Sequence, residues 1–439
     1  MQIERESICF KKKLLYQNSD MDKILINGVR RLDGKVKISG SKNSSLPILA
    51  ATLLSDETSF IENVPNLSDV SLMIRILQSL NSKILVNEKN FEIKNRKPKN
   101  LNVSYELVRK MRASFLILGP LLSRYGYAEV SMPGGCAIGT RPVDLHISGL
   151  EKLGAKFVIE EGYVKAKVNG QLKGTEIKLK KASVGATENI MMAAVLAEGQ
   201  TVLRNVAKEP EVEDLANFLI SIGANIKGAG TDEIIIDGVS DMHGTIFTIP
   251  ADRIEAGTYL IAAAITKGDV TISNIESIRM NNILDKLKLS GATINVGDNH
   301  IHLSMNESAI NPVDISTAPF PGFPTDMQAQ FTVLNSLSDG SAVVTENVFE
   351  NRFMHVQELN RMGCNITVKG SNAFIKGVSS LTGAPVMATD LRASASLILA
   401  GLCAQGETIV DRIYHIDRGY ERIEEKLSYL GANITRLPN

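Results

Sequence analysis

One pattern of apolar and polar positions recurs along the chain. A helix ends in Gly-Ala or a close variant, and an apolar residue three positions after the glycine marks a strand. The copies are spaced by roughly 70 residues, which fits a small α/β module better than a solenoid unit. A worn copy, Leu80–Ile84, has lost its glycine. The five intact copies are Leu153–Phe157, Ile222–Ile226, Ser290–Ile294, Met362–Ile366 and Leu430–Ile434.

Each glycine of this pattern is expected just after the last turn of a helix, where a positive φ is needed. Upstream of it, a second helix is rich in small apolar residues on all sides, so it is expected inside a lobe. Strands such as Val343–Thr345 and Thr408–Val410 alternate well enough to pack one face on these helices. Examples of the apolar helices are Leu46–Ala51, Ile190–Val195, Tyr259–Ala264 and Ala395–Ala400.

Six modules divide naturally into two lobes of three, with a cleft between them where ligands bind. Buried helices that run in parallel aim several N-termini at that cleft. Each N-terminus carries partial positive charge and unpaired N–H donors, so the cleft is expected to bind anions.

Composition describes an ordinary soluble globular chain of 439 residues, with 44% hydrophobic and 22% charged residues. Lys plus Arg equals Asp plus Glu, 48 each, so no net charge steers the protein toward nucleic acid or anionic membrane. Any anionic ligand needs a local cluster of cations. Four scattered cysteines are too few for a disulfide framework and fit a reducing compartment.

No apolar run approaches the ~20 residues of a membrane span. Lys11–Lys13 are followed by too short an apolar stretch for a signal peptide. Residues 1–20 are therefore interpreted as a polar N-terminal extension, and the protein is predicted to be cytoplasmic. The sequence does not determine the oligomeric state.

A Gly-rich and Pro-rich loop, Ser131–His146, presents one thiol. Three glycines and two prolines exclude a helix or a central strand there. Free cysteines are normally buried as small apolar residues, so Cys136 on such a loop indicates function. Arg141 and Asp144 follow it closely, and the loop ends at His146.

The residues that precede the buried helices are unusually charged. N-capping explains part of the set, because Ser, Thr and Asp are common at helix starts. It does not explain cations, which oppose the helix dipole and so indicate anionic ligands. The expected caps are Ser41, Ser183, Thr325 and Asp390. The unexplained cations are Lys42, Arg112, Lys181 and Arg392, to which Arg352 and Arg418 before later helices are added.

Other constellations of chemical interest are weak. The chain has no Gly-x-Gly-x-x-Gly after a strand, no Walker loop and no His-Glu-x-x-His. His300 and His302 alternate on a strand without a third ligand nearby, and we interpret them as surface residues. No cofactor and no metal are predicted. Tryptophan is absent and aromatic residues total 5%, which argues against base stacking on single-stranded nucleic acid.

Several motifs together resemble the UDP-N-acetylglucosamine 1-carboxyvinyltransferase family of enolpyruvyl transferases. The resemblance covers the chain from about Met21 to its end. Two departures are the N-terminal extension and Thr140, where Ala is common in the family. The matching motifs are Ser41–Asn43, Pro133–His146, Phe323–Gln328, Glu350–His355 and Asp417–Tyr420.

The resemblance implies an α/β fold of two inside-out lobes, each of three βαβαββ-type modules, with a cleft between them. Residues 42–249 would form one lobe, which carries the Cys136 loop. Residues 21–41 would join residues 250–439 in the other. The implied reaction transfers the enolpyruvyl group of phosphoenolpyruvate to the 3′-hydroxyl of UDP-N-acetylglucosamine, with release of phosphate. These two small molecules are the expected partners.

The resemblance also implies roles for single residues. Asp326 would accept the hydroxyl that attacks C2, and Cys136 would protonate C3 or form a covalent thioketal. Asp390 and Arg392 would hold Lys42 and the phosphate in place. The implied catalytic set is Cys136, Asp326, Lys42, Arg418, Asp390 and Arg392. Phosphoenolpyruvate would be bound by Lys42, Asn43, Arg141 and Arg418. The UDP-sugar would be bound by Arg112, Arg141, Pro142, Val143, Asp144, Leu145, Lys181, Ser183, Val184, Asp326 and Val348.

Two alternatives stay open at this point. The first is the sister enolpyruvyl transferase that acts on shikimate 3-phosphate, and the loop around Cys136 argues against it. The second is a non-catalytic paralogue that binds a nucleotide sugar. Four intact residues argue against that alternative: Lys42, Cys136, Asp326 and Arg418.

Overall fold

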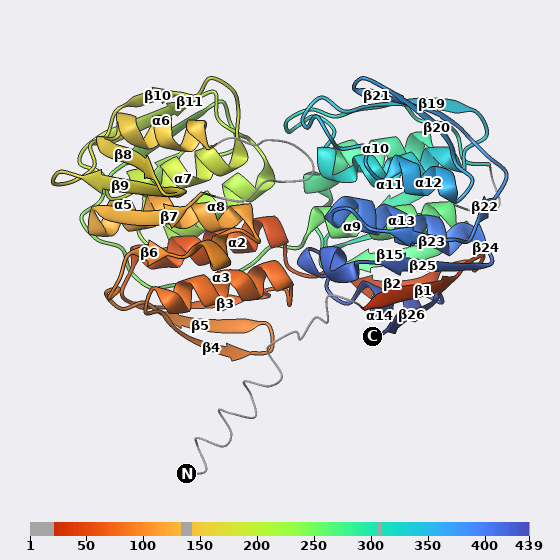
Figure 1. Cartoon of the computed structure of the whole chain (residues 1–439), viewed down its shortest axis with the longest axis horizontal. Helices are drawn as coiled ribbons and strands as arrows, with labels where there is room; N and C mark the ends of the chain where they lie inside the picture. Colours follow the sequence, from red (N-terminus) through yellow and green to blue (C-terminus); the bar gives the residue numbers. More distant parts are fainter. Residues whose placement is uncertain (1–21, 133–142, 306–308, 439) are drawn as a thin grey trace, which may run out of the picture.

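The computed structural model describes residues 22–132, 143–305 and 309–438. They form two α/β lobes that lie side by side, each with helices inside and sheets outside (Figure 1). The predicted extension, residues 1–20, lies outside the described residues. Within those described, no helix combines the length and the apolar composition that crossing a bilayer requires.

A four-stranded sheet is the unit of the fold, and the described residues form six such sheets. Lobe one has a hydrophobic core from Leu46 to Ile249 and contains three of these sheets. In strand order, the first consists of β14 (Ile246–Thr248), β3 (Thr58–Glu62), β5 (Asn90–Lys94) and β4 (Lys83–Asn87), and the second of β6 (Asn102–Val103), β7 (Tyr127–Ser131), β9 (Tyr163–Val168) and β8 (Ala155–Glu160). The third consists of β10 (Glu176–Lys178), β11 (Gln200–Arg204), β13 (Glu233–Asp237) and β12 (Asn225–Lys227).

Lobe two has a separate hydrophobic core, formed by residues 24–38 and 254–434. Its three large sheets are β2 (Asp33–Lys37), β15 (Asp269–Ser273), β17 (His300–Ser304) and β16 (Thr293–Val296); β18 (Ile315–Ser316), β19 (Ser341–Thr345), β21 (Asn372–Lys376) and β20 (Asn365–Lys369); β23 (Pro385–Met387), β25 (Glu407–Asp411), β1 (Lys23–Asn27) and β26 (Asn433–Leu437). A small ribbon pairs β22 (Leu381–Thr382) with β24 (Ala404–Gln405).

Every large sheet has the same pattern of strand directions. Its first edge strand runs parallel to its neighbour, as β10 does to β11, and the remaining pairs are antiparallel. The first helix of each module is largely buried, and the second lies beside it. The first helices are α2 (Lys42–Ala51), α5 (Leu118–Tyr125), α7 (Val184–Ala194), α9 (Arg253–Ile265), α11 (Gln328–Ser336) and α13 (Leu391–Cys403). The second helices are α3 (Ser68–Ser79), α6 (Asp144–Lys152), α8 (Pro210–Ser221), α10 (Asn281–Leu289), α12 (Val356–Arg361) and α14 (Ile423–Tyr429).

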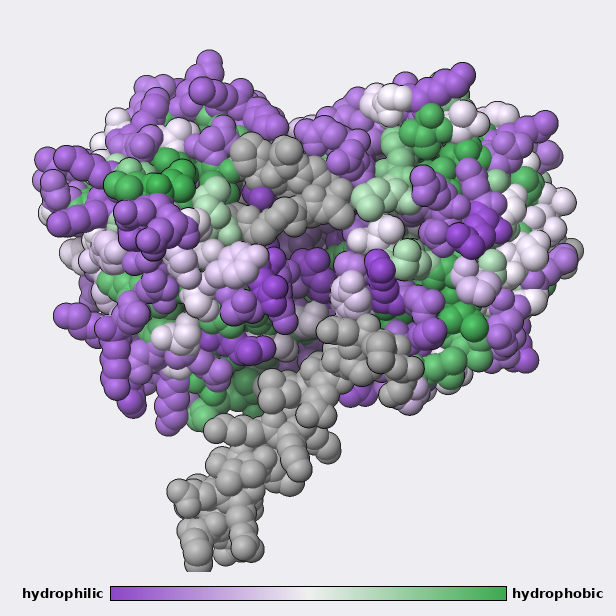
Figure 2. All heavy atoms as spheres, viewed as in Figure 1, coloured by the Kyte–Doolittle hydropathy of each residue, from purple (hydrophilic) through white to green (hydrophobic). Residues whose placement is uncertain are grey.

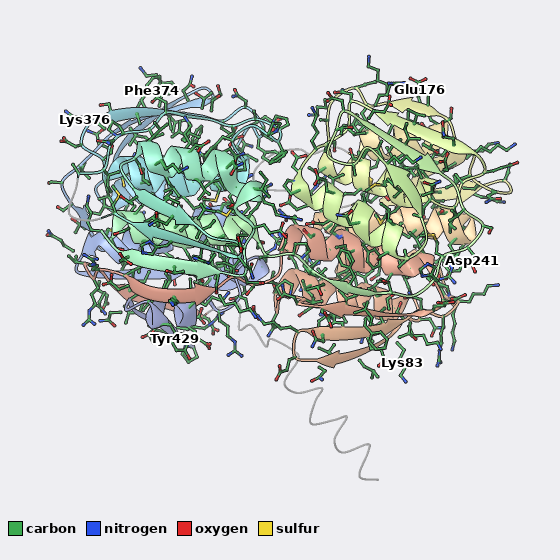
Figure 3. All side chains as sticks on the ribbon, turned by 180° about the vertical axis from the view of Figure 1, so that it is seen from behind. Lys83, Glu176, Asp241, Phe374, Lys376 and Tyr429 are labelled. Atoms are coloured by element: carbon green, nitrogen blue, oxygen red, sulfur yellow. The ribbon has the colours of Figure 1, made fainter. Side chains whose placement is uncertain are left out.

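Shorter helical segments complete the chain: α4 (Tyr105–Val108) and the 3-10 turns η1 (Thr52–Leu54), η2 (Arg112–Ile117), η3 (Ser277–Met280), η4 (Thr325–Met327) and η5 (Ile413–Arg418). The predicted burial of the apolar helices is confirmed, because all 13 residues of α9 are buried. Polar residues of the strands point outward, as Lys83, Glu176 and Lys376 do (Figure 3).

The chain crosses between the lobes twice, and each crossing exchanges an edge strand. β2 leads into α2 of lobe one but pairs with β15 of lobe two. β14 leads into α9 of lobe two but pairs with β3 of lobe one. β1 lies between β25 and β26, so the first two strands belong to the sheets of lobe two. Gly40 and Ala251 form a bridge between the two crossings.

The predicted backbone conformation after each helix is confirmed. Gly154 has φ 103°, and its equivalents Gly223, Gly291, Gly363 and Gly431 have φ between 94° and 108°. In the worn copy Asn81 takes the same place with φ 69°. Asn is the residue that tolerates the left-handed region best after glycine, so the first module keeps the turn without the glycine.

Three of the four predicted caps are confirmed. The side chains of Ser41, Ser183 and Asp390 accept hydrogen bonds from backbone N–H groups in the first turns of α2, α7 and α13. The prediction for Thr325 is wrong, because Pro324 precedes η4 and the Thr325 hydroxyl donates to Glu346 instead, at 2.8 Å.

Gly154 tests the requirement for positive φ without a packing effect, because a Cβ there would meet nothing within 4 Å. Gly154→Ala should lower the free energy of unfolding by about 1–2 kcal/mol, which is the cost of left-handed backbone for an L-residue. Gly154→Asn should lose less, as Asn81 indicates. Urea unfolding of both variants measures this, and equal midpoints for Ala, Asn and wild type would contradict it.

Candidate active site

The charged residues that begin the buried helices gather where the two lobes meet. Arg253 at the start of α9 pairs with Glu211 of α8 across the junction, at 2.9 Å. Arg279 of lobe two pairs with Asp214 of lobe one at 2.8 Å. Hydrophilic surface lines both sides of the hollow between the lobes (Figure 2). The sequence predicted an anion-binding cleft between the lobes, at this junction.

The carboxylate of Asp69 joins two predicted substrate-binding cations from different lobes. Lys42, the first residue of α2, places its Nζ 3.0 Å from Asp69 Oδ2. Arg418, at the end of η5 in lobe two, donates from Nε to Oδ1 at 2.9 Å and from Nη2 to Oδ2 at 3.3 Å. Lys42 and Arg418 are thus brought together by a residue that the sequence did not single out.

The electrostatics of this cluster favour an added anion. Burial opposes ionisation of Asp69, but the charges of Lys42 and Arg418 outweigh it and hold the Asp69 pKa below its ordinary value. Burial lowers the pKa of Lys42. Asp69 raises this pKa, whereas the charges of Arg418 and Arg392 lower it further. The Asp69 carboxylate therefore pairs with two cations, one from each lobe.

Asp326 lies between two guanidinium groups. Arg352 Nη2 is 2.8 Å from Asp326 Oδ1, and Arg392 Nη2 is 2.7 Å from Oδ2. Burial opposes ionisation, yet Arg392 and Arg352 together hold the Asp326 pKa well below its usual range. Asp326 is therefore an ionised acceptor at neutral pH, with a fixed orientation.

Arg392 and Asp390 lie at the start of α13. Arg392 contacts Asp326 and the phenol of Tyr420, and Asp390 caps the helix through the N–H groups of Arg392 and Ala393. Arg392 acts on Lys42 through repulsion, because its charge lowers the Lys42 pKa. Their predicted support of Lys42 and the phosphate stays a prediction.

A second group of predicted residues meets in lobe one. His146 of α6 is buried, and burial together with the charge of Arg112 lowers its pKa to about 3. A Cβ on Gly185, beside the Ser183 cap, would lie 3.2 Å from the His146 ring. The starts of η2, α6 and α7 therefore converge. They carry the predicted nucleotide-sugar residues Arg112, Val143, Asp144, Leu145, Lys181, Ser183 and Val184.

The remaining predicted residues are more scattered. Asn43 is the second residue of α2, next to Lys42. Val348 follows β19, where its N–H donates to Glu346 Oε1 at 2.8 Å. Cys136, Arg141 and Pro142 lie outside the described residues, so their placement stays a prediction.

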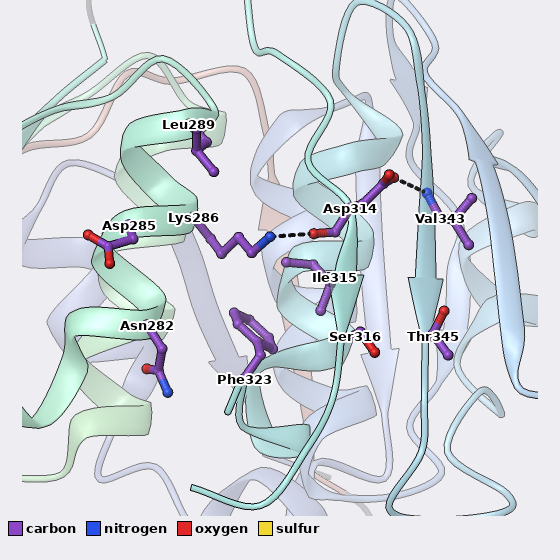
Figure 4. A pocket seen from close by; sticks show the side chains of 10 residues that line it. All are labelled: Asn282, Asp285, Lys286, Leu289, Asp314, Ile315, Ser316, Phe323, Val343 and Thr345. Atoms are coloured by element: carbon purple, nitrogen blue, oxygen red, sulfur yellow. Dashed lines mark hydrogen bonds between the residues drawn. The ribbon is translucent and has the colours of Figure 1, made fainter. Parts of the chain in front are cut away.

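A cavity of about 610 Å³ lies in lobe two between α10 and β18, and none of the predicted site residues lines it. Its polar groups are partly satisfied from within: Lys286 donates to the Asp314 carbonyl, and the Asp314 carboxylate accepts from the Val343 N–H (Figure 4). In the described ranges, no three His, Cys, Asp or Glu side chains are placed to share a metal ion.

Comparison with known proteins gives the family. Residues 26–427 match the family described as EPSP synthase (3-phosphoshikimate 1-carboxyvinyltransferase). A Coxiella burnetii protein named UDP-N-acetylglucosamine 1-carboxyvinyltransferase is 56% identical over 418 residues, 95% of this chain and 96% of that protein. A Pseudoalteromonas atlantica protein of the same name is 55% identical over 418 residues, 95% and 100% of the two chains.

The chain belongs to the UDP-N-acetylglucosamine 1-carboxyvinyltransferase family. The resemblance seen in the sequence motifs is thereby confirmed.

Solved structures confirm the predicted fold class. The enolpyruvyl transferase NikO from Streptomyces tendae has a TM-score of 0.87 at 24% identity, covering 95% of this chain and 100% of that one. EPSP synthase from Acinetobacter baumannii has a TM-score of 0.75 at 19% identity, with the same coverage. At these identities the likeness concerns the fold alone.

The sequence did not indicate Asp69, Glu346 or Tyr420 as residues of the site. Asp69 lies in the first turn of α3, where an acidic residue is explained by the helix dipole alone. Glu346 follows a strand and Tyr420 a Gly. Only the tertiary structure shows that each contacts predicted site residues or their neighbours.

Asp69→Asn should destabilise the protein by roughly 3–5 kcal/mol at neutral pH, because it leaves the buried Lys42 without its counter-ion. The Asp69 pKa is below its ordinary value of 3.8, so this stabilisation is complete above about pH 5 and is lost as the pH falls through the folded-state pKa. Thermal unfolding of both proteins from pH 3 to 7 should show a gap that narrows in acid.

Asp56→Asn is the matched control, since Asp56 pairs with Arg124 at the surface and its side chain is 67% exposed. Such pairs contribute at most about 1 kcal/mol. A stability gap for Asp69→Asn that equals this control, or that does not change with pH, would contradict the role of Asp69.

Proposed function

We infer that the protein transfers the enolpyruvyl group of phosphoenolpyruvate to the 3′-hydroxyl of UDP-N-acetylglucosamine and releases phosphate. The observation that carries this conclusion is 56% identity over 95% of the chain to a relative of that name. The reaction begins peptidoglycan synthesis, which links the protein to cell-wall biogenesis, cell shape, the cell cycle and cell division. We place it in the cytoplasm.

The cation cluster at the junction supports this assignment. Phosphoenolpyruvate carries nearly three negative charges and the UDP diphosphate about two more, so a chain without net charge needs focused cations. Lys42 and Arg418 share a single carboxylate, that of Asp69. We propose that they bind phosphoenolpyruvate together with Asn43 and Arg141.

The chemistry proceeds by addition and elimination. The 3′-oxygen of the sugar bonds to C2 of phosphoenolpyruvate while C3 gains a proton, which gives a tetrahedral intermediate. The bond from C2 to the phosphate oxygen then breaks, and C3 loses a proton to restore the double bond. We assign Cys136 as the acid at C3 and Asp326 as the acceptor of the hydroxyl proton, with Asp390 and Arg392 in support.

Asp326 fits the acceptor role through its fixed geometry. Both of its oxygens are oriented by guanidinium groups, at 2.8 and 2.7 Å. Its low pKa makes it a weak base, so it orients the hydroxyl first and accepts the proton once the new C–O bond has acidified it.

The UDP-sugar is assigned to the converging helix starts of lobe one and to the edge of lobe two. Helix N-termini bind phosphates through free N–H groups and the dipole, and Ser183 lies at such a start. We propose contacts from Arg112, Lys181 and Val184, from the stretch 141–145, and from Asp326 and Val348.

Two other functions have less support. The family match carries the name of the shikimate 3-phosphate enzyme, but the solved EPSP synthase is only 19% identical. A non-catalytic binding role is disfavoured because Lys42, Asp326 and Arg418 are retained and ordered around the junction. No observation requires a cofactor for the proposed reaction.

Phosphate release from phosphoenolpyruvate tests the assignment. Release should occur with UDP-N-acetylglucosamine and stay at background with shikimate 3-phosphate. Activity only with shikimate 3-phosphate would move the protein to the sister function. Tight binding of the UDP-sugar without release in either reaction would favour the non-catalytic alternative.

Arg418→Ala should act mainly on phosphoenolpyruvate. Loss of a charge-assisted contact of ~1.5–3 kcal/mol predicts a fall of about ten- to a hundredfold in kcat/KM for phosphoenolpyruvate. Binary affinity for UDP-N-acetylglucosamine, measured by calorimetry, should hardly change. Arg422→Ala is the control, since Arg422 pairs with exposed Glu425. A large drop in UDP-sugar affinity for Arg418→Ala would reassign the residue.

A further inference from the structure

Tyr420 lies where the three inner helices of lobe two begin. Its side chain is 1% exposed, and its hydroxyl contacts one residue from each helix. These are Thr258 of α9 at 2.8 Å, Gln330 of α11 at 3.3 Å and Arg392 of α13 at 3.2 Å. One phenol thus joins three helices.

The direction of these hydrogen bonds is fixed by donor counting. Thr258 Oγ1 donates its only proton to the Ile254 carbonyl, at 2.8 Å. The Tyr420 hydroxyl must therefore donate to Thr258. Its oxygen is left to accept, and Arg392 Nη1 and Gln330 Nε2 can only donate. The phenol is consequently the acceptor for one arm of the buried Arg392.

Two of the three partners of the phenol also contact Asp326. Arg392 uses its other arm, Nη2, to bind Asp326 Oδ2 at 2.7 Å. Gln330 Nε2 donates to the Asp326 carbonyl at 3.0 Å. Arg392 therefore links the Asp326 carboxylate to the phenol oxygen, and Gln330 links the Asp326 backbone carbonyl to the same oxygen.

We propose that Tyr420 is a positioning residue for the transfer reaction, which orients Arg392 so that Asp326 presents its carboxylate in one fixed direction to the attacking hydroxyl. This inference rests on the proposed function. Without the phenol oxygen, Arg392 Nη1 loses an acceptor in a buried site, and a buried donor without an acceptor favours rearrangement. The ring itself remains to pack beneath the guanidinium, whose carbon lies 5.6 Å from the ring centroid.

Tyr420→Phe removes the hydroxyl and keeps the ring. We expect kcat to fall by about ten- to a hundredfold, the loss for one charged hydrogen bond, with KM values for both substrates nearly unchanged. The acid limb of the kcat–pH profile should move to higher pH, because Asp326 loses part of the charge that lowers its pKa. The charged groups that act on Asp326 are Arg392 of α13, Arg352 after β19 and Arg253 of α9.

Tyr259→Phe is the matched control. Tyr259 follows Thr258 on α9, is also 1% exposed, and its hydroxyl has no hydrogen-bond partner among the described residues. Its removal should leave kcat and the pH profile unchanged. Equal effects of the two variants would show that any buried phenol matters, and would overturn the specific role of Tyr420.

Two further variants, at Thr258, test the same hydrogen bond if Tyr420→Phe does not fold. Thr258→Val removes the acceptor of the phenol proton and should reproduce the shifted acid limb, whereas Thr258→Ser keeps the hydroxyl and should restore the wild-type limb. A wild-type profile in both Tyr420→Phe and Thr258→Val would overturn the proposal.

A crystal structure of ligand-free Tyr420→Phe separates this proposal from the proposed function. We expect the contact from Arg392 Nη2 to Asp326 Oδ2 to be lost or displaced. An undisturbed contact would overturn the positioning role whatever the activity. Absence of turnover in the wild type with UDP-N-acetylglucosamine would instead overturn the proposed function.

Discussion

Cations at the starts of buried helices are the constraint on which the rest of the structure depends. A helix N-terminus disfavours a positive side chain, and burial makes an unpaired charge costly. Three such cations are paired with a carboxylate from another element: Lys42 with Asp69, Arg253 with Glu211, and Arg392 with Asp326. The lobes meet through pairs of this kind, because the carboxylates for Arg253 and Arg418 come from lobe one. The contact between the lobes and the proposed substrate binding therefore use the same charges.

The sequence predicted the repeat because its cause is local. A glycine after a helix needs positive φ wherever the helix lies, so Gly154 and its equivalents could be identified without a fold. The exchange of β2 and β14 could not be identified from the residue pattern, because an edge strand has the same pattern in either lobe. Only the resemblance to the family implied it. Asp69 and Tyr420 were missed for a related reason, because their partners lie far away in the sequence. Asp69 and Arg418, for example, are 349 residues apart. Thr325 showed the opposite error, since a local capping rule failed where a tertiary partner, Glu346, was available.

Three buried or partly buried histidines of the site contribute no positive charge near neutral pH. Burial lowers the pKa of His355 to about 4, with Asp390 and Arg352 acting in opposite directions. Burial and the charge of Arg418 lower the pKa of His415 to about 4, and His146 has a pKa of about 3. All three imidazoles are therefore neutral near pH 7. Positive charge at the junction therefore comes from lysine and arginine side chains and not from these histidines. In the proposed reaction, these lysine and arginine charges bind the substrate anions, and proton transfer is left to Cys136 and Asp326.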